Sequence, residues 1–262
     1  MSGNNTYERD AAADRQPRIL TRDDGPSIAY HRSGGRAPGV LFLTGFMSDM
    51  TGQKALALDE FCRSRGHACV RFDYRGHGQS YGAFEEANIA TWLEDALFVF
   101  DRLTEGPQVL VGSSMGGWLM LLLAKARPER VAALVGIAAA PDFTEDLLRA
   151  LTAEHGTEMA ATGRVIVRSQ YGDDYIFTRG LLDSGRAHCV LTDVIPFDGP
   201  VRLLQGMKDD AVPYANALRL QAALTSDDVE VILVKDGDHR LSRDEDLARL
   251  TSVVGALLDR LS

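Results

Sequence analysis

The chain has 262 residues, of which 45% are hydrophobic and 25% are charged, and its formal net charge is −9. This length allows one large α/β domain or two small ones, and the composition is that of a globular protein with a hydrophobic core. The acidic balance, with no block of Lys and Arg, argues against nucleic acid or an anionic membrane surface as a partner.

The cysteines and the N-terminal segment indicate the cellular compartment. Cys62, Cys69 and Cys189 are too few and odd in number for a disulfide framework, so a reducing compartment fits better. No Cys and His spacing resembles a zinc site, and no pattern calls for a cofactor. Residues 1–16 are polar and lack the apolar region of a secretory signal. We expect a disordered arm over 1–16, no membrane span, and a cytoplasmic protein without metal or cofactor.

Apolar runs bounded by turn residues predict eight β-strands. They are expected at residues 18–21, 27–31, 40–43, 68–72, 108–111, 131–137, 201–205 and 229–234. From residue 40 onward, strands alternate with helical patterns at 54–65, 91–103 and 118–126. Such alternation is typical of a parallel sheet with helices on both faces. The predicted fold class is therefore α/β, with a mostly parallel, twisted, eight-stranded sheet.

The alternation stops between Pro141 and Pro200, where no buried-strand pattern is found. We expect a cap of mostly short helices, inserted after the sixth strand and covering residues 141–199. The core would then comprise residues 17–140 and 200–262, ending in a strand, a helix at 214–224, a strand and a closing helix. Two capping boxes, Thr91 with Glu94 and Ser242 with Glu245, are expected to begin helices.

The segment 109–118 carries the strongest sign of chemistry. Three β-formers lead into Gly112-Ser-Ser114-Met-Gly116, and an apolar helical run follows at once. This context predicts a nucleophile elbow, in which Ser114 occupies a strained strand-to-helix turn. Gly112 and Gly116 stand where a Cβ would collide with the crossing elements. The N–H of Met115, at the helix N-terminus, is expected to stabilise an oxyanion.

The ends of other strands supply candidate partners, because ligands of open parallel sheets bind at the carboxyl ends of the strands. Asp209 and Asp210 follow the seventh predicted strand, and His239 follows the eighth. Together with Ser114 they give the chain order Ser, Asp, His of an α/β-hydrolase triad. Spacing alone leaves the two aspartates equal. A second oxyanion donor, the N–H of Phe46, is expected in the loop after the third strand.

Five other histidines compete with His239, but none of them lies between the last strand and the last helix. They are His31, His67, His77, His155 and His188.

From about residue 18 to its end, the chain resembles the α/β-hydrolase superfamily. The resemblance rests on Thr44-Gly-Phe46, on residues 71–80 and 112–116, on Gly206-Met-Lys-Asp209-Asp-Ala-Val-Pro213, and on Gly237-Asp-His239. The superfamily pattern Gly-x-x-Asp-x-x-Val-Pro implies that Asp209 is the catalytic acid. One departure is Thr44-Gly45, where the superfamily commonly has His-Gly. Further segments resemble the mitochondrial palmitoyl-protein thioesterases that also cleave acyl glucuronides, at residues 54–58, 60–62, 66–69, 112–120, 126–129, 203–213 and 238–240.

These patterns predict a serine esterase or thioesterase that acts through Ser114, His239 and Asp209 and an acyl-enzyme intermediate. The expected substrate is a small-molecule or acylated-protein ester or thioester, and the protein could be a monomer or a dimer. Two alternatives are a non-catalytic ligand-binding protein of the same fold, and a carbon–carbon-bond hydrolase or perhydrolase that uses the same triad.

Overall fold

A computed structural model describes residues 16–23, 25–168 and 174–262. All of the arm predicted at 1–16, except Gln16, lies outside the described residues. The core is an eight-stranded sheet in the order β1-β2-β4-β3-β5-β6-β9-β10. Its strands are β1 (Arg18–Leu20), β2 (Ile28–Ser33), β3 (Arg36–Leu43), β4 (His67–Phe72), β5 (Gln108–Ser113), β6 (Val131–Ile137), β9 (Val201–Gly206) and β10 (Val229–Val234).

The sheet is mostly parallel, which confirms the predicted fold class. Antiparallel pairing is confined to β1 with β2 and β2 with β4, and the six strands from β4 to β10 pair in parallel. Leu41, Leu110 and Leu134 lie side by side on β3, β5 and β6 and are fully buried. Continuous apolar strands of this kind are buried on both faces of the sheet.

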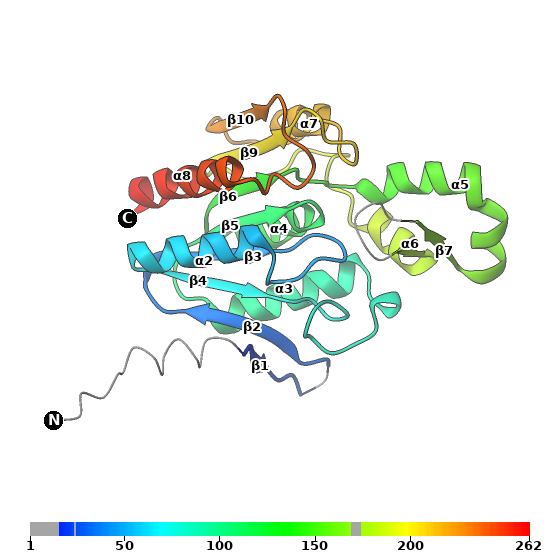
Figure 1. The fold of residues 1–262 in the computed structure, drawn as a ribbon, viewed down its shortest axis with the longest axis horizontal. Coiled ribbons are helices and arrows are strands. Elements are labelled where there is room, and N and C mark those ends of the chain that lie inside the picture. The colour runs from blue at the N-terminus through cyan, green and yellow to red at the C-terminus, as the bar shows by residue number, and fades with distance from the viewer. Residues whose placement is uncertain (1–15, 24, 169–173) are drawn as a thin grey trace.

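Helices cover both faces of the sheet (Figure 1). On one face, α2 (Gln53–Arg65) and α8 (Asp244–Leu261) pack against each other and share a hydrophobic cluster with the strands. On the other face, α3 (Ile89–Leu103), α4 (Met115–Ala126) and α7 (Ala215–Ala223) contribute to a second, larger cluster. Two short 3₁₀ helices, η1 (Phe84–Glu86) and η2 (Pro128–Arg130), lie in connecting segments.

Both predicted capping boxes are wrong. The N-cap of α3 is Asn88, whose side chain accepts the Thr91 N–H, while the Thr91 hydroxyl accepts the Asn88 N–H. Thr91 is therefore the N3 residue of the capping box and not its N-cap, and α3 begins about one turn earlier than this box predicted. The N-cap of α8 is Arg243 without a side-chain cap hydrogen bond, because the Ser242 hydroxyl donates instead to the carbonyl of Arg240.

The elements between β6 and β9 form the extension on the right of Figure 1. They are α5 (Phe143–Thr162), β7 (Arg164–Val167), β8 (Tyr175–Thr178) and α6 (Arg179–Ala187). The expectation of mostly short helices without strands is corrected, because α5 has 20 residues and β7 pairs antiparallel with β8. These strands have four residues each, too short for a clear alternating pattern. The predicted boundaries of the cap stay a prediction.

Hydrogen bonds fasten this extension to the core. The carboxylate of Asp142 does not cap its own helix, α5, but accepts the N–H groups of Val190 and Leu191, both at 2.8 Å. The indole N–H of Trp118 in α4 donates to the carbonyl of His188 at 3.0 Å. The Asp142 contacts join the two ends of the inserted segment to each other, and the Trp118 contact fastens the segment to α4.

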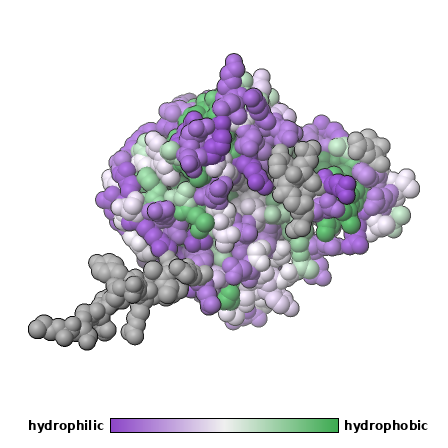
Figure 2. Space-filling view, in the orientation of Figure 1, coloured by the Kyte–Doolittle hydropathy of each residue, from purple (hydrophilic) through white to green (hydrophobic). Residues whose placement is uncertain are grey.

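Within the described ranges, no helix combines the length and the apolarity that crossing a bilayer requires. Hydrophilic residues dominate the face seen in Figure 2, and apolar residues are scattered among them in small areas.

The cap of α3 gives a first testable prediction. Asn88→Ala removes the cap and the hydrogen bond from the Ser184 hydroxyl, so we expect the free energy of unfolding to fall by about 1–2 kcal/mol. Urea unfolding measures this change. Ser242→Ala, at the other predicted box, should change stability by less than about 0.5 kcal/mol. If the free energy of unfolding falls equally in the two variants, this account of where the helices begin is contradicted.

Candidate active site

The backbone of Ser114 is strained. This residue is the N-cap of α4 and has φ 53° and ψ −120°, a conformation that costs a non-glycine residue about 1–3 kcal/mol. Hydrogen bonds to β6, to the segment after β6 and within α4 hold it in place. Its N–H donates to the carbonyl of Ile137 at 2.9 Å, and its carbonyl accepts the N–H groups of Gly117 at 2.9 Å and Ala140 at 3.0 Å.

Glycines allow the turn to close against its surroundings. A Cβ at Gly112 would lie 2.4 Å from the carbonyl oxygen of Gly116, and a Cβ at Gly116 would lie 2.1 Å from that of Leu43. Both obstacles are backbone atoms, so no side chain can move aside to make room. The glycines therefore bring β3, β5 and α4 together and leave the Ser114 hydroxyl exposed to the cavity described below.

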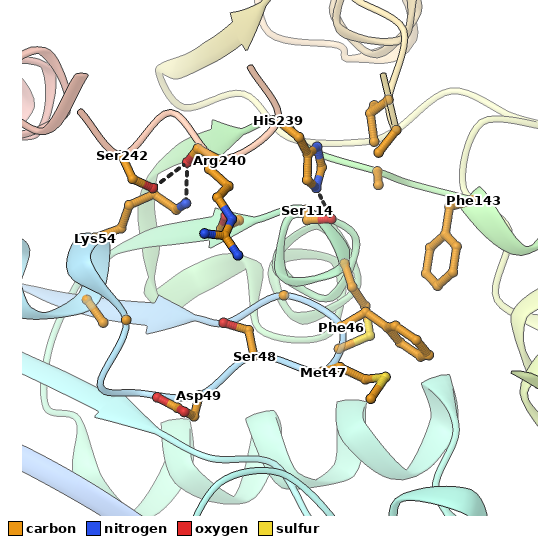
Figure 3. A pocket seen from close by; sticks show the side chains of 18 of the residues that line it. Phe46, Met47, Ser48, Asp49, Lys54, Ser114, Phe143, His239, Arg240 and Ser242 are labelled. Atoms are coloured by element: carbon orange, nitrogen blue, oxygen red, sulfur yellow. Dashed lines mark hydrogen bonds between the residues drawn. The ribbon is translucent and has the colours of Figure 1, made fainter. Parts of the chain in front are cut away.

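His239 and Asp209 complete a hydrogen-bonded line with Ser114. Nε2 of His239 lies 3.1 Å from Oγ of Ser114, and Nδ1 of His239 lies 2.9 Å from Oδ2 of Asp209 (Figure 3 shows the first of these contacts). The three residues follow β10, β9 and β5, whose carboxyl ends meet at one edge of the sheet. In this geometry the imidazole can take a proton from the hydroxyl while the carboxylate holds its other nitrogen.

The carboxyl group of Asp209 is held in its ionised form. Burial would raise its pKa, but the hydrogen bond from His239 and the N–H groups of Val212 and Ala211 bring the pKa below its ordinary value. These N–H groups donate to Oδ1 at 2.7 and 2.9 Å, and the side-chain amide of Gln205 donates to Oδ2 at 2.9 Å. Asp210, which spacing left as an equal alternative, is exposed.

The competing histidines have other surroundings. His67 is the first residue of β4, so it lies at the other end of the strand from the edge where Ser114, His239 and Asp209 meet. Its Nδ1 lies 2.9 Å from the Pro38 carbonyl oxygen. His188 ends α6, with Nδ1 2.7 Å from the Ser184 carbonyl. His77 is buried beneath the loop that carries Phe46.

A cavity of about 680 Å³ opens over Ser114, and its two halves differ in character (Figure 3). Ser114 and His239 lie between the halves. The apolar half is lined by Phe46, Met47, Phe143, Tyr175 and Phe177. The polar half is lined by Ser48, Asp49, Gln53, Lys54, Arg240 and Ser242.

The ring of Phe46 joins the core to the inserted segment. It stacks on Phe177 with centroids 5.6 Å apart and meets the edges of Phe84 and Phe143 at 5.0 and 5.9 Å. Its backbone also lies close to Ser114, since a Cβ on the preceding Gly45 would be 3.4 Å from Cβ of Ser114. Phe46 and Met115 both line the cavity, and their N–H groups as oxyanion donors stay a prediction.

Sequence reasoning missed several residues of the site. Lys54 donates to the carbonyl of Arg240, next to His239, and burial lowers the pKa of its ammonium group to about 8. On a helical pattern a lone lysine looks like part of a solvated face, so nothing in the sequence marked it. Gln205 left a usable signal, because it is a polar residue that directly follows Leu203 and Leu204 near the end of a strand.

No group of three or more His, Cys, Asp or Glu side chains within the described part of the chain is placed to hold a metal ion.

Comparisons with known proteins give a consistent result. The model of the family described as "alpha/beta hydrolase fold" matches residues 38–175. Human "Palmitoyl-protein thioesterase ABHD10, mitochondrial" is 43% identical, over 93% of this chain and 80% of its own length. The structure of mouse alpha/beta hydrolase domain-containing protein 10 superposes with a TM-score of 0.88 at 43% identity, covering 94% of this chain and 99% of that one. The crystal structure of a protein from Agrobacterium vitis S4 superposes with a TM-score of 0.88 at 41% identity, covering 93% of this chain and 98% of that one.

The glycines of the elbow give a second prediction. Gly112→Ala should lower the free energy of unfolding by at least about 2 kcal/mol, because its Cβ would overlap backbone atoms of Gly116 and Gly117. Gly34→Ala is the matched control, since a Cβ there meets nothing within 4 Å, and it should leave stability unchanged within about 0.5 kcal/mol. Chemical denaturation compares the two variants. A Gly112→Ala protein as stable as the control would refute the close packing described for the elbow.

Proposed function

Because the chain belongs to the α/β hydrolase fold family, we propose that it is a serine hydrolase of carboxylic esters or thioesters whose catalytic triad is Ser114, His239 and Asp209. The observation that carries the proposal is the continuous line of contacts from Oγ of Ser114 through the His239 ring to Asp209, at 3.1 and 2.9 Å. A serine hydroxyl is a weak nucleophile at neutral pH, and it needs such an adjacent base.

In the proposed acylation step, Oγ of Ser114 attacks the acyl carbon and its proton passes to Nε2 of His239. Asp209 holds the Nδ1–H and stabilises the imidazolium ion that forms. The carbonyl oxygen of the substrate becomes an oxyanion, which accepts hydrogen bonds from the N–H groups of Phe46 and Met115. When the tetrahedral intermediate collapses, the bond to the leaving oxygen or sulfur breaks, and His239 gives its proton to the leaving group.

Deacylation repeats these steps with water as the nucleophile. His239 removes a proton from the water molecule, which attacks the acyl carbon bound to Ser114. The second tetrahedral intermediate releases a carboxylic acid, and the proton returns to Oγ of Ser114. The chain's own residues supply every proton transfer.

The two halves of the cavity support an assignment of the substrate groups. We place the acyl group in the apolar half, against Phe46, Phe143 and Phe177, where burial of its methylene groups contributes about 0.8 kcal/mol each. The leaving group then extends toward the polar half. Since several curated relatives, the human one among them, are named as palmitoyl-protein thioesterases, acylated proteins join small-molecule esters and thioesters as candidate substrates. Those relatives are also named as mitochondrial, and the cytoplasmic location expected from the sequence stays a prediction.

The triad gives a third prediction. Asp209→Asn should lower kcat for matched ester and thioester substrates about 10⁴-fold, because the wrong tautomer of His239 would be held toward Ser114. Asp210→Asn, at the neighbouring exposed carboxylate, is the matched control and should change kcat less than about twofold. Steady-state kinetics over acyl chains from acetyl to palmitoyl provide the measurement.

Ser114→Ala in the same assay separates this proposal from its alternatives. Turnover that persists in this variant would contradict the proposed nucleophile. A wild-type protein that binds acyl compounds without turning them over, and whose Ser114 resists a fluorophosphonate probe, would instead be a non-catalytic binding protein.

A further inference from the structure

Two loops lie beneath the cavity and are hydrogen-bonded to each other. Residues 44–50 follow β3, and residues 73–80 follow β4. The carboxylate of Asp73 accepts the Met50 N–H through Oδ1 at 2.7 Å and the Gln79 N–H through Oδ2 at 2.8 Å. The second loop is therefore tied to the far end of the first, and it forms a fixed support under the segment that carries Phe46.

His77 makes a further contact between these loops, at Met47, the residue after Phe46. Its Nε2 accepts the N–H of Met47 at 3.2 Å, and its Nδ1 faces the carbonyl of Arg75 at 3.4 Å. His77 is only 4% exposed. Three aromatic side chains meet it edge to face, namely Tyr74, Phe84 and Trp92.

The surroundings of His77 decide which of its nitrogens carries a proton. Burial lowers the pKa of the ring to about 4, against the opposing influence of the Arg75 carbonyl and the Asp49 carboxylate. The ring is therefore neutral at neutral pH. Since the Met47 N–H needs an acceptor, the single ring hydrogen lies on Nδ1, toward Arg75, and Nε2 keeps its lone pair.

The Met47 N–H lies one peptide group beyond the Phe46 N–H. Met47 has φ +50°, which is uncommon for a residue other than glycine, so its peptide group needs an external constraint. His77 supplies that constraint on one side of Phe46, and the packing of Gly45 against Ser114 supplies it on the other. With both neighbours fixed and the Phe46 ring held in the aromatic cluster, the direction of the Phe46 N–H is set.

We infer that His77 is a positioning residue of the oxyanion hole, which holds the Met47 N–H through Nε2 and thereby aims the Phe46 N–H at the carbonyl oxygen of the substrate. This inference rests on the proposed function, because it assigns a role within the same reaction. His77 touches no reacting atom, so its effect is exerted through the backbone of Phe46 and Met47. It should therefore act on the transition state and leave ground-state binding of the substrate unchanged.

Two substitutions of His77 test the inference. His77→Leu removes the acceptor and retains an apolar side chain of moderate size, whereas His77→Gln places an amide oxygen near the position of Nε2. We expect His77→Leu to lower kcat about 10–100-fold, less than the loss of an entire oxyanion donor, with KM unchanged within about twofold. His77→Gln should recover most of the lost kcat.

A transition-state analogue provides a readout that a purely structural role would not move. A trifluoromethyl ketone forms a tetrahedral adduct with the serine, and the matching methyl ketone serves as the ground-state reference. His77→Leu should weaken inhibition by the trifluoromethyl ketone by the same factor as kcat and leave inhibition by the methyl ketone unchanged. His67→Leu is the control, since His67 is also buried but lies at the far end of β4, and it should lower stability without changing kcat of the folded protein.

The inference is overturned if His77→Leu keeps wild-type kcat and inhibition while losing thermal stability, or if His77→Gln loses as much kcat as His77→Leu. If the wild-type protein shows no turnover that Ser114→Ala abolishes, the proposed function is overturned, and the inference is overturned with it. The two failures are distinguishable because the first leaves the Ser114→Ala effect intact.

Discussion

The strained backbone of Ser114 sets the requirements for the elements around it. Its φ of 53° persists because β6 and the segment after it bind its N–H and carbonyl, and because Gly112 and Gly116 let α4 cross β5 and β3 at close range. Adding one Cβ would force the helix away from the sheet. The buried packing of α4 against the sheet thus keeps the backbone of Ser114 in an unfavourable conformation.

The parallel sheet explains how distant segments reach that side chain. Ser114 and His239 are 125 positions apart in the chain, yet both follow strands that end at the same edge. The loops after β9 and β10 lie so close together that a Cβ on Gly206 would be 2.4 Å from the carbonyl oxygen of Gly237. This contact fixes the distance between Asp209 and His239. The cap adds the aromatic wall, through the rings that surround Phe46.

Strand periodicity and motif context predicted the sheet and the residues that meet at its edge, because both depend on local sequence. Asp209 needed more, since spacing could not separate it from Asp210. The cap of α3 was missed although it is local, because Asn88 pairs with Thr91 only three residues away. Features set by tertiary contacts were also missed: the short strands β7 and β8, Lys54 beside the Arg240 carbonyl, and the support that His77 gives to Met47. In the sequence, His77 was one of the histidines that competed with His239 for the role of base. In the structure, its buried and neutral ring suits a hydrogen-bond acceptor instead.

We propose that Ser114 is the nucleophile and that the N–H groups of Phe46 and Met115 form the oxyanion hole. A crystal structure of the protein after reaction with a long-chain alkyl fluorophosphonate tests it most directly. We predict a bond from phosphorus to Oγ of Ser114, with the phosphoryl oxygen about 3 Å from the backbone nitrogens of Phe46 and Met115 and the alkyl chain against the Phe46 cluster. An adduct on another residue, or a phosphoryl oxygen turned away from both nitrogens, would contradict the account.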